Sequence, residues 1–118
     1  MPRLNSQQFK VLFKTGQRVL KKGQWLFIFK ANSLAINRYG FVIPKKSAKL
    51  STVRNRTKRL LREACRLNKQ NITQGFDMIL FAYKPLESFK QAEELFFEAL
   101  AKAKMLKNRQ IDVKSSIY

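Results

Sequence analysis

The sequence predicts an α/β two-layer sandwich with the element order α-β-β-β-α-β-α and a four-stranded sheet. Three segments place apolar residues at helical spacing, and four shorter segments are alternating or continuously apolar, as strands are. The chain has 118 residues, of which 45% are hydrophobic. This length and composition indicate one folded domain with a core rather than a disordered basic chain.

The first half of the chain predicts one helix followed by three strands. Asn5 or Ser6 can cap a short helix that runs to Lys14, and Gly16 lies just past its end. The strands are expected at residues 18–20, 24–30 and 35–43. The second strand carries aromatic residues at every other position, which gives it one strongly apolar face; these residues are Trp25, Phe27 and Phe29.

The second half predicts a helix, a strand and a helix. A basic helix is expected over residues 53–69. Residues 76–83 read FDMILFAY and predict a buried central strand that ends before Pro85. Ser88 is expected to cap a last helix, whose apolar residues recur at helical spacing: Phe89, Ala92, Phe96, Ala99, Leu100 and Ala103. From Lys107 the tail is polar and is expected to fray.

The basic helix, with Ser47 or Ser51 as its expected N-cap, has two opposite faces. Residues 45–69 hold ten Lys or Arg residues and a single acid, Glu63. At about 100° per residue, the apolar side collects Val53, Thr57, Leu60, Leu61, Ala64 and Leu67. The other side, an arc of about 140°, collects Arg54, Asn55, Lys58, Arg59, Arg62, Arg66 and Lys69. One face can therefore bury itself while the other presents cations to water.

The net charge of +18 is concentrated in the first two thirds of the chain. Residues 1–44 hold eight basic residues and no acid, and residues 45–69 hold ten against one. A solvated helix face is one interpretation, and a surface for a polyanion is the other. The chain offers too few acids to pair these cations at i,i+4 spacing, which favours nucleic acid as the partner.

The chain lacks the residues of the common catalytic and metal sites. It has no His, which excludes an imidazole general base and the usual zinc sites. Its seven acids form no close Asp pair for two Mg²⁺ ions, and its four glycines are scattered. Cys65 is the only cysteine and is expected to be a packed thiol. Without a membrane-length apolar run or a signal-peptide core, a cytoplasmic location is expected.

Four segments, in order along the chain, resemble one known family. Residues 53–66 read VRNRTKRLLREACR, which closely resembles the RNR motif of the bacterial ribonuclease P protein subunit. Residues 3–16, RLNSQQFKVLFKTG, resemble its opening helix, and residues 40–46, GFVIPKK, resemble the strand and lysine pair before its long helix. Residues 76–85, FDMILFAYKP, resemble the strand that follows. The resemblance covers about residues 3–106.

The resemblance implies a fold that packing rules would not give. The family has a ribosomal-protein-domain-like fold with a left-handed β-α-β crossover that contains the RNR helix. Elementary rules predict a right-handed crossover, the hand of about 98% of such connections. The resemblance also implies a single ribonuclease P protein domain over residues 1–118.

The resemblance further implies the role of an accessory protein in an endoribonuclease whose catalytic subunit is RNA. In this family the protein binds the ribonuclease P RNA subunit and guides the 5′ leader of precursor tRNA, which the enzyme removes. The Mg²⁺ ions are held mainly by RNA, so neither a catalytic residue nor a dedicated metal ligand is expected in the chain. A monomeric free protein without a membrane partner is expected.

The family's functional residues carry over to two groups of positions. The RNA-binding group is Lys45, Lys46, Arg54, Asn55, Arg56, Lys58, Arg59, Arg62 and Arg66. Arg56 lies off the main basic arc, so it is expected to turn toward the cleft or to brace it. The leader-cleft group is Phe9, Phe13 and Phe27, with Trp25 or Ile28 as rivals of Phe27 because the match has a gap near Gly23. Phe9 and Phe13, at i and i+4, equally suit core packing.

Two other classes of protein share these features. A non-enzymatic RNA-binding module, such as a ribosomal protein or an RNA chaperone, would show the same charge and the same missing active site. A protein of anionic membrane surfaces would need exposed Trp, Phe or Leu side chains, which are required here for the core.

Overall fold

The centre of the molecule is a four-stranded sheet with the strand order β1-β2-β4-β3. The computed structural model describes residues 2–106. Its elements are α1 (Ser6–Thr15), β1 (Gln17–Lys21), β2 (Trp25–Ala31), β3 (Arg38–Val42), α2 (Ser51–Leu67), a 3₁₀ turn (Lys69–Asn71), β4 (Phe76–Ala82) and α3 (Phe89–Lys102). The predicted element order is confirmed, whereas the tail that was expected to fray from Lys107 lies outside the described residues.

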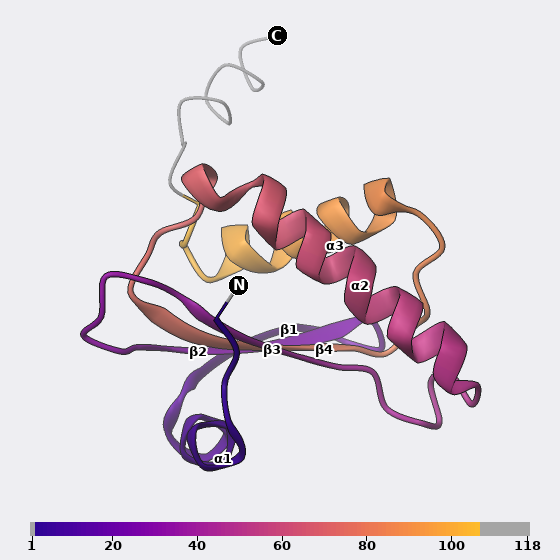
Figure 1. Cartoon of the computed structure of the whole chain (residues 1–118), viewed down its shortest axis with the longest axis horizontal. Coiled ribbons are helices and arrows are strands. Elements are labelled where there is room, and N and C mark those ends of the chain that lie inside the picture. Colours follow the sequence, from indigo (N-terminus) through magenta and orange to yellow (C-terminus); the bar gives the residue numbers. More distant parts are fainter. Residues whose placement is uncertain (1, 107–118) are drawn as a thin grey trace, which may run out of the picture.

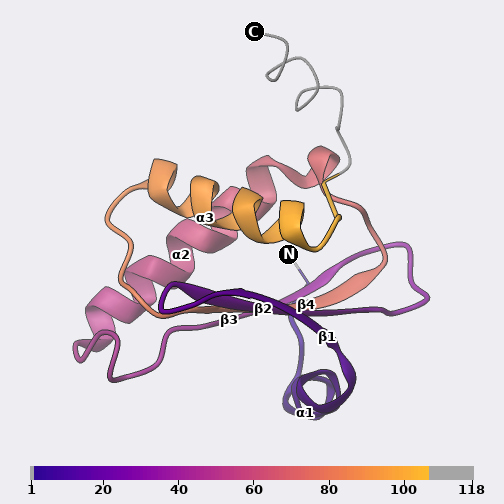
Figure 2. The same ribbon diagram turned by 180° about the vertical axis from the view of Figure 1, so that it is seen from behind.

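The helices lie on both faces of this sheet. The two long helices, α2 and α3, form a layer on one face, and α1 crosses the opposite face (Figure 1, Figure 2). β2 is antiparallel to β1 and β4, whereas β3 is parallel to β4. In Figure 1, β3 runs to the right, α2 returns above the sheet, and β4 runs to the right behind β3. This crossover is left-handed, as the family resemblance implied.

The strands alternate between two apolar cores. Phe27 and Phe29 on β2, with Met78 and Leu80 on β4, face α2 and α3 in the larger core. Ile28 on β2 and Ile79 on β4 point to the opposite face. There they pack against Leu12 of α1 in the smaller core. Because both faces of β2 and β4 are covered, these strands are apolar at nearly every position. Among residues 2–106, no helix is both long and apolar enough to span a bilayer.

The prediction that Phe27 lines an exposed cleft is wrong. Its side chain is 0% exposed and lies in the larger core beneath α2 and α3. The rivals Trp25 and Ile28 are 1% and 0% exposed. The alternation identified the apolar face of β2 correctly, but that face is covered by the helix layer, and α1 covers Ile28 on the other side.

The ends of α1 are set by two specific residues. The side chain of Asn5 accepts a hydrogen bond from the Gln8 N–H at 2.8 Å, and the Gln8 side chain accepts one from the Asn5 N–H at 2.9 Å. This capping box confirms Asn5 as the N-cap. At the other end, a Cβ on Gly16 would lie 2.6 Å from Cγ2 of Ile28. Gly16 is therefore required by close packing between α1 and β2.

The ends of the other two helices differ from each other. The Ser88 hydroxyl accepts a hydrogen bond from the Gln91 N–H and caps α3, as predicted. The prediction of Ser47 or Ser51 as the cap of α2 is wrong, because the N-cap is Leu50 and it offers no side-chain hydrogen bond. The loop before α2 is instead held by Arg54, which is described below.

Candidate nucleic-acid interface

α2 turns its basic arc away from the sheet because its apolar arc is buried. Thr57, Leu61, Ala64 and Cys65 are buried against the sheet and α3. Burial raises the pKa of the Cys65 thiol, so it is a packed thiol, as predicted. The cationic residues of the arc are then distributed between a cleft beside β3 and the outer surface of the helix.

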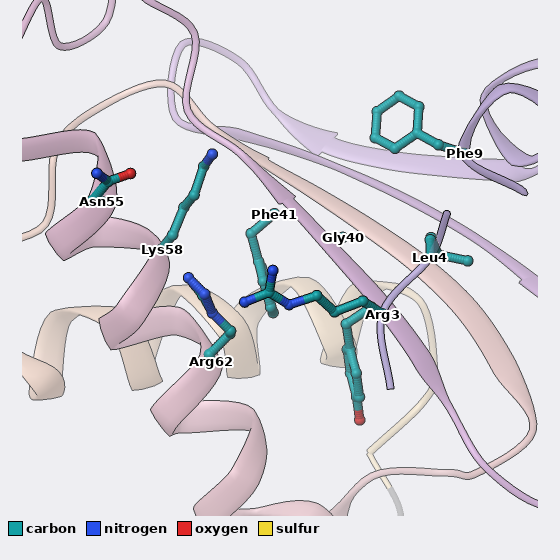
Figure 3. A pocket seen from close by; sticks show the side chains of 9 residues that line it. Arg3, Leu4, Phe9, Gly40, Phe41, Asn55, Lys58 and Arg62 are labelled. Carbon is teal, nitrogen blue, oxygen red and sulfur yellow. The ribbon is translucent and has the colours of Figure 1, made fainter. Parts of the chain in front are cut away.

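The cleft has a volume of about 370 Å³ and lies between α2, β3 and the N-terminal segment (Figure 3). Three predicted residues of α2 line it: Asn55, Lys58 and Arg62. Phe9 of α1 lies at the far side of β3, also as predicted for a cleft residue. The other lining residues were not foreseen: Arg3, Leu4, Tyr39, Gly40 and Phe41.

Arg3 reaches the cleft because the N-terminal segment pairs with the open edge of β3. The Leu4 N–H donates to the Tyr39 carbonyl at 3.0 Å, and the Tyr39 N–H donates to the Pro2 carbonyl at 3.2 Å. This short parallel bridge fixes the backbone on both sides of Arg3. A bridge of this length leaves no pattern in the sequence, so sequence reasoning missed Arg3.

The cleft concentrates positive charge, and no acid is found among the described residues that line it. The guanidinium of Arg3 points toward that of Arg62, and the Lys58 side chain extends from the same face of α2 (Figure 3). The pKa of Arg62 is lowered, first by burial and then by the charge of Arg3. Within residues 2–106, none of these three groups forms an ion pair. An anion between the two guanidinium groups would relieve their repulsion.

Anions with the geometry of phosphate are therefore expected to stabilise the free protein. Sulfate or phosphate should raise the melting temperature more than chloride does at matched ionic strength, since specific binding adds RT ln(1 + [L]/Kd) to stability. Thermal unfolding with each salt measures this difference, and Arg62→Ala should reduce it. Equal stabilisation by both salts would indicate general screening of the +18 charge instead.

The remaining basic residues of α2 occupy its outer surface. Arg56 and Arg59 are exposed and line a second, shallow depression, which shares Asn55 with the cleft. The expectation that Arg56 turns toward the cleft is thus wrong, because its position on α2 directs it outward. Arg66 is also exposed, but it is paired with Glu63 one turn earlier, which lowers the pKa of that carboxyl. Arg66 is therefore the least available cation of the predicted group.

Arg54 is used differently from its neighbours. Its Nη1 atom donates hydrogen bonds to the Ala48 and Lys49 carbonyl oxygens, both at 2.8 Å. These bonds tie the first turn of α2 to the loop that carries Lys45 and Lys46, which are both exposed. Arg54 therefore holds the loop in place while its other nitrogen atoms remain for a ligand.

Replacing Arg54 should weaken RNA binding and also loosen the preceding loop, whereas replacing Lys58 should only weaken RNA binding. Lys58→Ala should weaken binding to a partner RNA by about 1 kcal/mol and lower the salt slope by about one unit. Arg54→Ala should also speed amide exchange throughout residues 44–50, because the loop loses its brace. Hydrogen exchange and salt titrations of both variants measure the difference. Unchanged exchange in Arg54→Ala would refute the bracing role.

An aromatic surface adjoins the cleft on the α1 side of the sheet. The rings of Phe9 and Phe13 lie 6.4 Å apart at 7°, as expected for successive turns of α1. Phe13 is 42% exposed, and the Arg18 guanidinium lies 4.7 Å from the centre of its ring. Phe9 is half-buried and contacts both the cleft and Phe81. Phe13 is thus a surface ring, whereas Phe9 combines packing with a place in the cleft.

The described part of the chain gives no sign of a self-contained active site. Residues 2–106 hold no cluster of three or more Asp, Glu, Cys or His side chains that could bind a metal ion. Two acids near the ends of this region are already engaged: Asp77 forms two 2.8 Å bonds with Arg38, and Glu63 of α2 pairs with Arg66. The chemistry this surface supports is recognition of phosphates and unpaired bases.

Comparison with known proteins gives one consistent family. The sequence model of the Ribonuclease P family matches residues 3–105. The ribonuclease P protein component of Natranaerobius thermophilus is 41% identical over 106 residues, which cover 88% of this chain and 90% of that protein. The corresponding protein of Alkaliphilus oremlandii is 32% identical, covering 86% of this chain and 89% of its own.

Solved structures show the same fold. The ribonuclease P protein of Staphylococcus aureus superposes with a TM-score of 0.78 at 24% identity, covering 90% of this chain and 98% of that one. The ribonuclease P protein of Thermotoga maritima gives a TM-score of 0.65 at 29% identity, covering 92% and 97%. Sequence, fold and basic cleft agree: the chain belongs to the ribonuclease P protein family.

Proposed function

We propose that this chain acts as the protein subunit of ribonuclease P. In this proposal it binds the RNA subunit through the basic surface of α2 and holds the 5′ leader of precursor tRNA along the cleft and the adjoining aromatic surface. The holoenzyme hydrolyses the phosphodiester bond that joins leader to tRNA. The free protein is proposed to be monomeric and to act in the cytoplasm.

One observation carries the proposal: beside an aromatic surface, the cleft places three cations that form no ion pair with any residue from 2 to 106. Arg3, Lys58 and Arg62 supply charge for phosphates, and Phe9 lies across β3 from them. Phosphate contacts of this kind bind a strand without reading its sequence. Aromatic rings stack on any unpaired base and add about 1 to 3 kcal/mol per base. Together they suit a single strand of varied sequence, as a set of leaders requires.

The proposed division of labour leaves the metal with the RNA. Mg²⁺ would be held mainly by the RNA subunit and the substrate, where it would activate the water nucleophile and stabilise the leaving oxygen. The contribution of this chain is to bring the two RNA molecules together and to offset their mutual repulsion. The benefit should be largest where Mg²⁺ is scarce, because the protein's cations then replace screening ions.

Reconstitution with a bacterial ribonuclease P RNA tests this function. At low Mg²⁺ the chain should stimulate cleavage of precursor tRNA by the RNA, and the chain alone should cleave nothing. Lys58→Ala should require a higher protein concentration for the same stimulation, and Lys90→Ala, on α3, serves as the matched control. Cleavage by RNA-free protein would overturn the proposal. RNA binding without stimulation would favour a non-enzymatic RNA-binding module.

A further inference from the structure

The aromatic surface beside α1 continues onto β4. The ring of Phe81 lies 6.4 Å from that of Phe9 and 6.0 Å from that of Phe13. The ring of Tyr83 lies a further 6.5 Å from Phe81, in a stacked orientation at 29°. The four rings form a continuous array on the α1 side of the sheet, and neither the RNR motif nor the opening helix includes its last two members.

Phe81 and Tyr83 have different places in this array. Phe81 is flanked by both rings of α1 and packs against the smaller core, so it supports the others. Tyr83 comes after the last residue of β4, is half-buried, and has no α1 ring against it. Its backbone N–H donates to the Gln24 carbonyl at 3.0 Å, which fixes the position of its Cα. The array therefore ends in a ring that is held firmly but only partly covered.

Positive charge gathers at the same end of the sheet. β3 and β4 are parallel, with Val42 opposite Phe81. β3 ends at Val42 and β4 at Ala82, so the lysine pair that follows β3 and Lys84, which follows β4, come after the same end of this parallel strand pair. Lys45, Lys46 and Lys84 are all exposed. A ring at the end of the sheet from which these exposed lysines follow suits a nucleotide, whose base stacks while its phosphates meet the cations.

We propose that Tyr83, supported by Phe81, is a base-stacking residue for one further unpaired nucleotide beyond the Phe9–Phe13 surface. The inference rests on the proposed function, because it assigns an additional subsite to the same leader. RNA is favoured over an acidic peptide because the array offers flat rings in contact with one another, which match stacked bases. Purines, with the larger ring system, should bind this subsite more tightly than pyrimidines.

A series of leader lengths locates the subsite. Precursor tRNAs with leaders that grow by single nucleotides are titrated with the holoenzyme reconstituted from this chain and a bacterial ribonuclease P RNA. The affinity of the wild-type holoenzyme should rise in steps as the leader lengthens. One of these steps should be absent in Tyr83→Ala, so that longer leaders lose about tenfold in affinity. Shorter leaders should bind the variant and the wild type equally. Tyr83→Phe should keep the step, because it keeps the ring.

The controls separate this inference from the proposed function. Leu67→Ala removes a more exposed apolar side chain at the far end of α2 and should leave every step intact. If wild-type holoenzyme shows no dependence on leader length, the proposed leader role itself fails. If it does, and Tyr83→Ala shows the same steps, Tyr83 is not a subsite. Loss of affinity for mature tRNA in Tyr83→Ala would likewise overturn the inference, since mature tRNA has no leader.

Discussion

Phe27→Ala is expected to remove a large part of the stability of the free protein. The ring is completely buried between the sheet and the helix layer, where it stacks on Phe29 at 5.5 Å. Removing a buried phenyl ring costs about 3 to 5 kcal/mol, and the whole stability of a domain is about 5 to 15 kcal/mol. The melting temperature should fall by about 15 °C or more. Thermal unfolding followed by circular dichroism measures this loss.

The same variant also tests whether Phe27 has any role in the leader cleft. With sulfate present to keep the variant folded, its preference for leader-bearing over mature tRNA should equal that of the wild type. Phe27→Leu should recover much of the stability, because it refills most of the volume. A variant that keeps its melting temperature but loses leader affinity would contradict the burial of Phe27.

Local patterns predicted the elements well because local interactions set them. The helical spacing of α2 correctly separated its buried residues from its basic ones, and Asn5 and Ser88 cap their helices as their side chains allow. The strands were predicted within a few residues because apolar segments bounded by turn residues have few other ways to bury themselves. The α2 residues that line the cleft had been assigned to the basic arc for the same reason, although their place in the cleft was not predicted.

The errors occur where distant segments meet. The alternation along β2 places Phe27 and Ile28 on opposite faces of the sheet, but it does not predict which face the helices cover. In the structure, helices cover both faces. Arg3 enters the cleft through a bridge to Tyr39 that involves two backbone hydrogen bonds. Arg54 falls within the basic arc of the helical wheel, yet its side chain also bonds to the preceding loop. None of these contacts, long-range or local, has a periodic signature.

The handedness of the crossover is a separate case. Packing rules favour a right-handed connection between the parallel strands β3 and β4. The observed connection through α2 is left-handed (Figure 1). The hand has a functional consequence: it lays α2 beside β3 at the open edge of the sheet, where the N-terminal segment and Phe9 complete the cleft. Only the family resemblance predicted it.

Phe13→Ala is expected to weaken binding of leader-bearing precursor tRNA while leaving assembly with the RNA subunit almost unchanged. Phe13 is an exposed ring of α1; Arg18 covers part of it, and the exposed remainder is available to stack on a base. The loss should be about 1 to 3 kcal/mol, the worth of one base–aromatic stack. Binding of mature tRNA should not change. Equilibrium titrations of holoenzyme with both RNAs measure the two affinities.

The matched control for Phe13→Ala is Val11→Ala, which removes another exposed apolar side chain of α1 away from the ring array. It should leave both affinities intact. The melting temperature of Phe13→Ala should fall by only a few degrees, because the ring's contacts with Phe9 and Phe81 leave much of it in water. A large fall in melting temperature with unchanged leader affinity would make Phe13 a packing residue. The leader would then be held by the phosphate contacts of Arg3, Lys58 and Arg62 alone.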